Sequence, residues 1–256
     1  MTAVDLHHVV EGPDDAPALV LLNSLGSTLA MWEPQIEALA ARFRVVRCDL
    51  RGHGRSPVPP GPYALADLGG DVVALLDTLG IPRAHVAGVS LGGMIAMWLA
   101  IHTPERVDRI VPCCTSAKLG PPQAWRDRAA LVREQGTGAV ADAVVARWVT
   151  PTWAAAHPAG YRRLRDMIAS TPPEGYAGCC AAIEVMDQED DLHRITAPTL
   201  VIAGADDPAT PPDHGARIAA RIPGARMAVI PHAMHLANIE RPAQVTERII
   251  SHLRVA

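Results

Sequence analysis

Short apolar segments alternate with longer amphipathic ones along most of this 256-residue chain. The short segments have the length and the β-branched content of buried strands, and they predict strands at 4–10, 18–23, 43–48, 84–89, 107–112, 199–203 and 226–230. The longer segments have helical periodicity and predict helices at 31–42, 66–80, 91–102, 213–221 and 242–254. Because each helix follows a strand and a turn, the pattern favours an α/β fold with a mostly parallel sheet flanked by helices.

The stretch from 118 to 195 departs from this alternation. It contains the amphipathic segments PPQAWRDRAALVREQ, GAVADAVVARWV and AGYRRLRDMIAS, with no strand-like segment between them. A helical insertion between two strands of one sheet is a simpler interpretation than a separate domain. We therefore predict a core formed by residues 1–117 and 196–256, with a helical cap at 118–195.

Composition and charge narrow the possible functions. Hydrophobic residues make up 49% of the chain and charged residues 20%, as in folded globular proteins. The net charge is −4 and no run of Lys or Arg occurs, which argues against nucleic-acid binding. The segment MTAVDLHHVVEG does not resemble a signal peptide, and the apolar segment MIAMWLAI is too short to span a bilayer. We expect a cytoplasmic protein without a membrane partner.

The cysteine spacing supports the same expectation. Besides Cys48, the chain contains two adjacent pairs, Cys113-Cys114 and Cys179-Cys180. Neighbouring cysteines do not easily bridge each other, and no C-x-x-C metal spacing occurs. We therefore expect reduced, mostly buried thiols and no metal site.

A serine lies between a predicted strand and a predicted helix, in the segment AHVAGVSLGG. Residues 88–92 fit the G-x-S-x-G pattern of a nucleophile elbow. The serine of such a turn has a strained backbone, which Gly88 and Gly92 tolerate because they have no Cβ atom to collide with it. The turn would place Ser90 at a helix N-terminus, where N–H groups favour negative charge. We predict Ser90 as the nucleophile.

Serine is a weak nucleophile, so a base must accept its proton and an acid must orient that base. In proteins with this elbow both groups follow the serine in the chain. The segment APTLVIAGADDPATPP ends a predicted strand with two acids, Asp206 and Asp207. We favour Asp207, because the fourth position of a Gly-x-x-Asp turn most often carries this carboxylate. Asp206 remains the alternative.

Histidine supplies the candidate base. His235, in VIPHAMHLANIERP, follows the last predicted strand and precedes the last predicted helix. His232 is closer to that strand, but we favour His235 because the loop needs length to cross towards the serine. His53, in DLRGHGRS, is interpreted as a residue that braces its turn.

Two backbone N–H groups are candidates for an oxyanion hole, which stabilises the charge that develops during acyl transfer. One belongs to Leu91, the residue after the nucleophile. In proteins with this elbow the other comes from the loop after the third strand of the fold. The corresponding segment here is LVLLNSLGS, and the predicted donor is the N–H of Leu25.

Taken together, these segments resemble the α/β-hydrolases, and most closely the family of 3-oxoadipate enol-lactonases. The resemblance extends over nearly the whole chain, in LLNSLGSTLAMW, RCDLRGHGRS, GVSLGGMIAMWLA, RWVTP, TPPEGYAGCCAAIE, APTLVIAGADDPATPP and HLANIERP. TPPEGYAGCCAAI is the most specific of these, because Ser-His-Asp chemistry does not require it. The chain departs from most α/β-hydrolases at Asn23-Ser24, where they carry His-Gly. The segments VPCCTSAKLG and PHAMHL also differ from the sequences typical of the family.

The resemblance implies an enzyme that opens 3-oxoadipate enol-lactone to give 3-oxoadipate. Ser90 would attack the lactone carbonyl, and water activated by His235 would release the acyl group. The implied partner is a small carboxylated lactone, no metal or organic cofactor is implied, and no oligomeric state is defined.

The carboxylate of such a substrate would need a cation. The predicted cap offers Arg126, Arg128, Arg133, Arg147, Arg162, Arg163 and Arg165. Arg133 and Trp148 lie in stretches that match the family's cap, so we predict them as substrate contacts, with Ser24 beside the predicted oxyanion donor as a third. The alternative is that such arginines only solvate a helix face and that the tryptophan fills a core.

Other functions are compatible with the same residues. Another lactonase, a carboxylesterase or a C–C hydrolase could use the same triad. A non-catalytic ligand-binding protein on this fold is an alternative from a different class, since a fold does not dictate function.

Overall fold

The computed structural model describes residues 2–253 and has a seven-stranded sheet at its centre. Its strand order is β1-β3-β2-β4-β5-β6-β7. Neighbouring strands run parallel, except that β1 pairs with β3 in the antiparallel sense. The predicted mostly parallel sheet is therefore confirmed. Its strands are β1 (His8–Glu11), β2 (Ala18–Leu22), β3 (Arg44–Cys48), β4 (Ala84–Val89), β5 (Val107–Cys113), β6 (Leu200–Gly204) and β7 (Arg226–Ile230).

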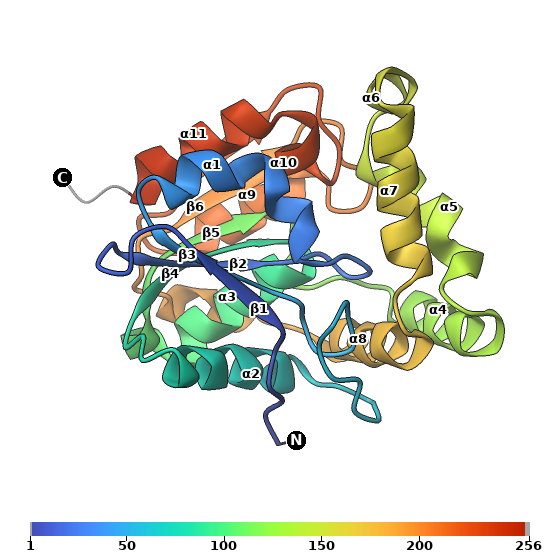
Figure 1. Ribbon diagram of the computed structural model, residues 1–256, viewed down its shortest axis with the longest axis horizontal. Helices are drawn as coiled ribbons and strands as arrows, with labels where there is room; N and C mark the ends of the chain where they lie inside the picture. Colours follow the sequence, from blue (N-terminus) through green and yellow to red (C-terminus); the bar gives the residue numbers. More distant parts are fainter. Residues whose placement is uncertain (1, 254–256) are drawn as a thin grey trace.

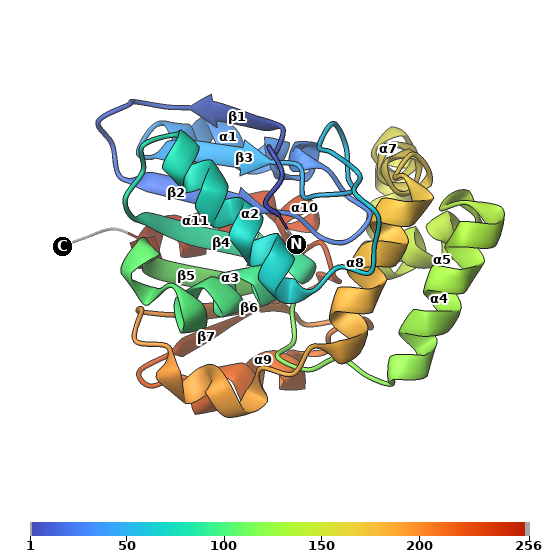
Figure 2. The ribbon, with the colours of Figure 1, turned by 90° about the horizontal axis from the view of Figure 1, so that it is seen from below.

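Helices cover both faces of this sheet, which is why its central strands are apolar on both sides. Figures 1 and 2 show α1, α10 and α11 on one face and α2, α3 and α9 on the other. The helix α3 is buried around almost its whole circumference, as its apolar sequence LGGMIAMWLAIH requires. The bounds of the core helices are α1 (Glu33–Ala40), α2 (Leu65–Thr78), α3 (Leu91–His102), η2 (Pro104–Arg106), α9 (Pro212–Arg221), α10 (Ala237–Glu240) and α11 (Pro242–Leu253).

The first strand begins later than predicted. A strand was expected at 4–10, but β1 begins at His8. The Val4 N–H donates to a carboxylate oxygen of Asp71 at 2.9 Å, and the His7 N–H donates to the Ser56 hydroxyl at 2.9 Å. The N–H groups of Val4 and His7 are therefore bound by side chains rather than by a neighbouring strand. The apolar pattern of this segment does not reveal these contacts.

Two predicted helices also differ at their ends. The predicted helix 31–42 is a 3₁₀ turn, η1 (Leu29–Trp32), followed by α1, which ends at Ala40. In the predicted helix 242–254, α11 ends at Leu253, and residue 254 lies outside the described residues. Residue 1 and residues 255–256 of the predicted core lie outside them as well.

The helices between β5 and β6 form a layer beyond the carboxyl ends of the parallel strands (Figure 1). All of them fall within the predicted cap range, whose limits, 118 and 195, remain a prediction. The short helix η3 at the end of this range packs on α3 and α9 of the core. The bounds are α4 (Pro122–Gln135), α5 (Gly138–Trp148), α6 (Pro151–Ala156), α7 (Pro158–Ala169), α8 (Pro173–Val185) and η3 (Glu189–Arg194).

The helix α8 was not predicted, because its sequence PEGYAGCCAAIEV combines a proline with two glycines, which are poor helix formers. Its packing explains the glycines. A Cβ atom on Gly175 would lie 2.0 Å from the carbonyl oxygen of Gly52, and one on Gly178 would lie 2.6 Å from the ring of Tyr63. The backbone of α8 therefore touches the loop after β3, and tertiary contact overrides the weak local propensity.

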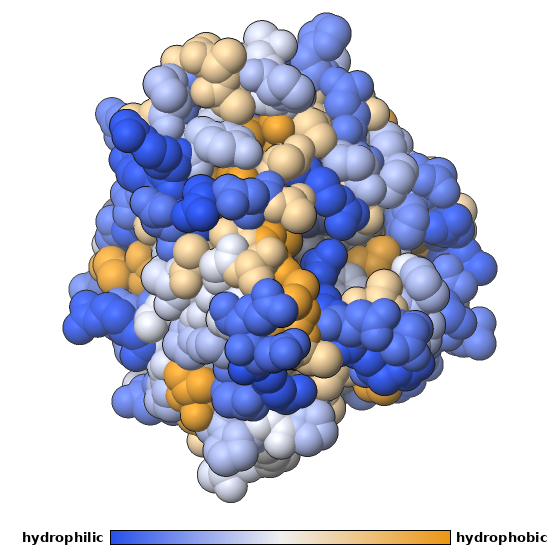
Figure 3. Space-filling view, turned by 90° about the vertical axis from the view of Figure 1, so that its right-hand side faces the viewer, coloured by the Kyte–Doolittle hydropathy of each residue, from blue (hydrophilic) through white to orange (hydrophobic). Residues whose placement is uncertain are grey.

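The face of the molecule that carries the cap is mostly hydrophilic, with apolar residues in a band through its middle and in smaller scattered patches (Figure 3). This distribution fits the amphipathic pattern of the cap segments, whose apolar sides pack inward. No helix within residues 2–253 is long and apolar enough to cross a membrane.

Candidate active site

The turn between β4 and α3 has the geometry that the G-x-S-x-G pattern predicts. Ser90 has φ 56° and ψ −114°, a conformation that non-glycine residues rarely adopt. A Cβ atom on Gly88 would lie 2.2 Å from the carbonyl group of Gly92, and one on Gly92 would lie 2.3 Å from the carbonyl oxygen of Leu22. Only glycine fits at both positions, so the sharp turn depends on them.

The end of β5 holds the backbone of this serine on both sides. The Ser90 N–H donates to the Cys113 carbonyl at 2.9 Å. The Thr115 hydroxyl donates to the Ser90 carbonyl at 2.7 Å. The sequence contained no signal for Thr115, because this contact joins two strands that are distant along the chain.

Asp207 and His235 lie together at the carboxyl edge of the sheet. The Nδ1 atom of His235 is 2.8 Å from Oδ2 of Asp207. Asp206 and His232, the alternatives, are both exposed. The structure therefore brings the favoured acid and the favoured base into contact.

Thr210 is a further residue of this group that sequence reasoning missed. Its hydroxyl donates to Oδ2 of Asp207 at 2.8 Å, and its N–H donates to Oδ1 at 3.0 Å. Burial raises the pKa of Asp207, but the neighbouring His235 charge, the hydrogen bond to His235 and the bonds from Thr210 outweigh it, so the pKa lies below its ordinary value. The carboxylate is therefore ionised at neutral pH. The Asp-x-x-Thr spacing could have signalled this turn.

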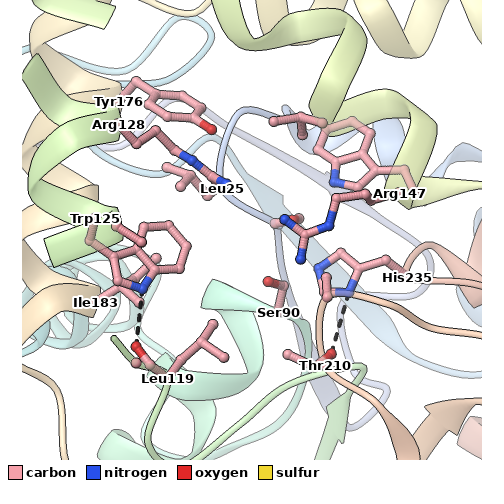
Figure 4. A pocket seen from close by; sticks show the side chains of 16 residues that line it. Leu25, Ser90, Leu119, Trp125, Arg128, Arg147, Tyr176, Ile183, Thr210 and His235 are labelled. Carbon is pink, nitrogen blue, oxygen red and sulfur yellow. Dashed lines mark hydrogen bonds between the residues drawn. The ribbon is translucent and has the colours of Figure 1, made fainter. Parts of the chain in front are cut away.

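Ser90, His235 and Thr210 line one cavity of about 250 Å³ between the sheet edge and the cap. In Figure 4 the Ser90 hydroxyl faces the open space of this cavity, with His235 on the adjoining wall. Within residues 2–253, no hydrogen bond joins the Ser90 hydroxyl to His235. Such contacts commonly tighten only when substrate binds.

Two N–H groups near Ser90 have no acceptor among the described residues, those of Leu25 and Leu91. Their neighbours are engaged: the Gly26 N–H donates to Nε2 of His53 at 2.9 Å, and the Gly92 N–H donates to the Asn23 carbonyl at 3.0 Å. Leu91 is also the first residue of α3, where N–H groups lack intrahelical partners. The pair is thus available to an acceptor in the cavity, and its role as an oxyanion hole remains a prediction.

His53 contacts its own turn, as expected, and also the turn that carries Leu25, which the sequence did not predict. Its Nδ1 lies 3.1 Å from the Arg51 carbonyl, so Nδ1 carries the hydrogen and Nε2 accepts the Gly26 N–H. Complete burial lowers the pKa of His53. The neutral ring, which alone can accept this bond, is therefore the stable form.

The cationic residues of the cavity are Arg128 and Arg147 rather than Arg133. Arg133 does not line the cavity; its side chain is 42% exposed, and its guanidinium pairs with Glu174 at 3.1 Å. This location corrects the expectation that Arg133 contacts the substrate. Ser24 and Trp148, the other predicted contacts, do line the cavity and are 2% and 3% exposed.

Arg128 and Arg147 have no carboxylate partner within residues 2–253. Arg128 lies 4.9 Å from the centre of the Trp125 ring, and Arg147 donates to the Pro208 carbonyl at 3.3 Å. Burial lowers the pKa of Arg147, and the charge of Arg128 lowers it further. The buried hydroxyl of Tyr176, on the same cavity wall as Arg128, finds no acceptor within residues 2–253. Figure 4 shows these groups around one space, which would suit an anion.

Residues 2–253 contain no group of three or more His, Cys, Asp or Glu side chains arranged to hold a metal ion. The five cysteines are free and buried, as expected. Burial raises the pKa of the Cys48 thiol to about 12. Such thiols are poor nucleophiles and poor metal ligands at neutral pH.

The sequence of this chain matches a known protein family. The family model of the alpha/beta hydrolase fold matches residues 17–242. The 3-oxoadipate enol-lactonase 2 of Acinetobacter baylyi is 43% identical over 244 residues, covering 94% of this chain and 91% of that protein. A putative carbamate hydrolase RutD of Variovorax paradoxus is 33% identical and covers 97% of this chain and 96% of its own length.

A solved structure gives the same result. The crystal structure of the enol-lactonase from Burkholderia xenovorans LB400 has a TM-score of 0.96 and 41% sequence identity, and covers 98% of this chain and 96% of its own. The resemblance to α/β-hydrolases, and within them to enol-lactonases, is thereby confirmed, as is the prediction of a hydrolase that acts on ester bonds. The chain belongs to the α/β-hydrolase family.

Proposed function

We propose that this protein hydrolyses 3-oxoadipate enol-lactone to 3-oxoadipate through an acyl-enzyme on Ser90. One observation carries the proposal: a cavity that contains Ser90 and His235 also contains two arginines without a carboxylate partner. A small ester with a free carboxylate matches both features. The similarity to proteins named 3-oxoadipate enol-lactonase, at 43% and 37% identity, supports this substrate.

In the first half of the reaction Ser90 attacks the lactone carbonyl. His235 accepts the hydroxyl proton at Nε2, since Nδ1 is engaged by Asp207 at 2.8 Å. The Asp207 carboxylate orients the ring and stabilises the imidazolium that forms. The developing oxyanion accepts hydrogen bonds from the N–H groups of Leu25 and Leu91, each worth about 2.7–4 kcal/mol.

The ring then opens when the bond between the carbonyl carbon and the ring oxygen breaks. The leaving group is an enol, which tautomerises to a ketone, so it needs less protonation than an alkoxide would. Its carbon chain remains tethered through the acyl group on Ser90. His235 returns its proton to the departing oxygen.

In the second half, water enters the cavity and His235 removes its proton. Attack on the acyl carbon repeats the same oxyanion geometry, and cleavage of the ester releases Ser90 and a new carboxylate. The guanidinium groups of Arg128 and Arg147 hold the original carboxylate throughout, and the Tyr176 hydroxyl donates to it. Bidentate binding of this kind is characteristic of arginine.

A second candidate is carbamate hydrolysis, since several similar proteins are named putative carbamate hydrolase RutD, with 33% identity in one case. The same triad and the same cationic cavity would serve a small carbamate that bears a carboxylate. The two candidates differ in the leaving group, which is an enol in one and, in the other, an amine or an alcohol, depending on which bond to the carbamate carbonyl breaks.

The test is hydrolysis of enol-lactone generated from muconolactone, followed by loss of its ultraviolet absorbance. We expect kcat/KM for this lactone to exceed that for a neutral p-nitrophenyl ester and for a carboxylated carbamate. Faster cleavage of the carbamate would favour the second candidate, and faster cleavage of the neutral ester would refute an anionic substrate.

The Ser90→Ala variant should lose turnover of every substrate by several orders of magnitude. A matched control is Ser116→Ala, because Ser116 is another buried serine whose hydroxyl contacts a histidine, His214, at 2.8 Å. Ser116 does not line the cavity, so this variant should retain activity. Retained turnover in Ser90→Ala would contradict the proposed mechanism.

A further inference from the structure

Two of the segments that carry the resemblance to enol-lactonases, RWVTP and HLANIERP, meet at one buried carboxylate. Glu240, the last residue of α10, is 4% exposed. Its Oε1 accepts the Thr150 N–H at 2.8 Å and the Thr150 hydroxyl at 2.6 Å, and its Oε2 accepts the Met234 N–H at 2.6 Å. The two oxygens of a rigid planar group thus bind two different parts of the chain.

The partner on Oε1 belongs to the cap. Thr150 lies between α5 and α6, and its hydroxyl also accepts the Trp153 N–H at 3.2 Å as the N-cap of α6. Arg147 and Trp148, which line the cavity, precede it by three and two residues. The contact between Glu240 and Thr150 therefore fixes the end of α5, which places Arg147 and Trp148 at the cavity.

The partner on Oε2 belongs to the loop of the candidate base. Met234 directly precedes His235, and Leu236, which follows it, donates its N–H to the Trp148 carbonyl at 2.8 Å. His235 is consequently held between two backbone hydrogen bonds. One runs directly to the cap, and the other reaches the cap through Glu240.

We infer that Glu240 is a positioning residue that couples the placement of the cap to the placement of His235, an inference that rests on the proposed role of His235 as the base. Movement of the cap at Thr150 shifts the carboxylate and with it the Met234 N–H. The base has its productive position only while the cap is closed over the cavity. Hydrolysis of the acyl-enzyme is thereby tied to a closed site.

A residue that only holds the cap would act differently from one that also places the base. Loss of the cap contact alone would weaken binding of the charged lactone, which needs Arg147, and would raise its KM. Displacement of His235 lowers kcat for every substrate, including a small neutral ester that does not use the arginines. A misplacement of about 1 Å can cost about 10²-fold in rate.

The first variant is Thr150→Val, which keeps the shape and the N–H group but removes the hydroxyl donor. We expect kcat for both the lactone and the neutral ester to fall about tenfold, with the KM of the ester unchanged. The Thr150→Ser variant keeps the hydroxyl and should retain most of the rate. An unchanged kcat for the ester in Thr150→Val, with only the lactone KM raised, would overturn the inference.

The matched control is Thr137→Val, because the Thr137 hydroxyl is also buried in the cap but donates only to the Ala169 and Thr171 carbonyls, at 3.0 and 2.8 Å. It should leave kcat for the ester unchanged. An equal fall of kcat in Thr150→Val and Thr137→Val would indicate a general loosening of the cap and would contradict the coupling between Glu240 and His235.

The second variant is Glu240→Gln, which offers one carbonyl oxygen where the carboxylate offers two acceptors. Either the Thr150 or the Met234 N–H then faces an NH₂ group, so kcat should fall at least as far as in Thr150→Val. Hydrogen exchange of the segment 231–238 supplies a readout that does not depend on catalysis, and it should accelerate in Thr150→Val but not in Thr137→Val. If Ser90→Ala retained activity, the proposed function would fail, but the difference in hydrogen exchange would still test the coupling. Unchanged exchange of this segment in Thr150→Val would overturn the coupling.

Discussion

Arg128 offers the sharpest test of how the cavity binds its substrate. It lies on α4, faces the cavity beside Trp125 and has no carboxylate partner within residues 2–253. The variant Arg128→Met removes the charge and keeps much of the aliphatic stem, so packing against the cavity wall changes little.

The expected magnitude follows from the charges. A guanidinium and a carboxylate about 4 Å apart attract each other by about 4 kcal/mol at an effective dielectric constant of about 20. Desolvation reduces the net value to roughly 1.5–3 kcal/mol, typical of a hydrogen bond to a charged group. This range corresponds to about a 10- to 150-fold loss of kcat/KM. Because Arg147 remains, we expect the lower half of that range.

The assay compares kcat/KM for the enol-lactone with that for a neutral ester of similar size. The lactone value should fall and the ester value should change less than about threefold, because only the lactone carries the carboxylate. The matched control is Arg133→Met on the same helix, whose guanidinium pairs with Glu174 outside the cavity. It should affect neither substrate. An equal loss for both substrates in Arg128→Met, or a larger loss in Arg133→Met, would refute the reasoning.

Three further predictions follow from the buried groups. The Asp207→Asn variant should lower kcat about 10³- to 10⁴-fold, because the amide is uncharged and its NH₂ group donates to Nδ1 of His235, which moves the ring hydrogen to Nε2, the atom that must accept the Ser90 proton; near-normal kcat in an ester assay would contradict this. Burial lowers the pKa of His53. Below about pH 6.5 its imidazole therefore binds a proton in the unfolded chain but not in the folded chain. The free energy of unfolding should consequently fall by up to about 1.36 kcal/mol per pH unit as the pH decreases. In urea unfolding at pH 7 and pH 5, His53→Gln should lose less stability than wild type between the two, and an equal loss would refute the prediction. Burial raises the pKa of Cys48 and Cys180 to about 12, so iodoacetamide at pH 8 should label the native protein slowly and the urea-unfolded protein at all five cysteines, as counted by mass spectrometry.

The nucleophile could be predicted because its requirements are local. The strand end, the two glycines and the helix start around Ser90 all lie within a short stretch of sequence, and the clash that a Cβ would cause at Gly88 is with Gly92 of the same turn, whereas the clash at Gly92 is with Leu22 of the neighbouring strand. Asp207 and His235 could be chosen because each follows a recognisable strand, and parallel strands bring their carboxyl ends to one edge.

The choice among the arginines could not be made in the same way. Arg128 and Arg133 lie on the same helix, five positions apart, which places them about 140° apart around its axis. Which side of α4 faces the cavity depends on its packing against α8. Local helix propensity did not predict α8, because its sequence contains two glycines. Thr115 was missed for a related reason, since only the folded chain brings it near Ser90, whereas the contact between Thr210 and Asp207 is local and its Asp-x-x-Thr spacing was overlooked.

The amino-acid sequence by itself determined the mostly parallel sheet, the strained serine turn, the candidate triad and the turn that carries Leu25. Each of these depends on periodicity, on glycine at a crowded position or on the order of strands. The tertiary structure alone decided which cap arginines face Ser90, how His53 braces the oxyanion turn and how Glu240 joins the cap to the loop of His235. The contacts between Gly26 and His53 and between Thr150 and Glu240 join residues 27 and 90 positions apart, so they depend on the packing of the whole chain rather than on any local pattern.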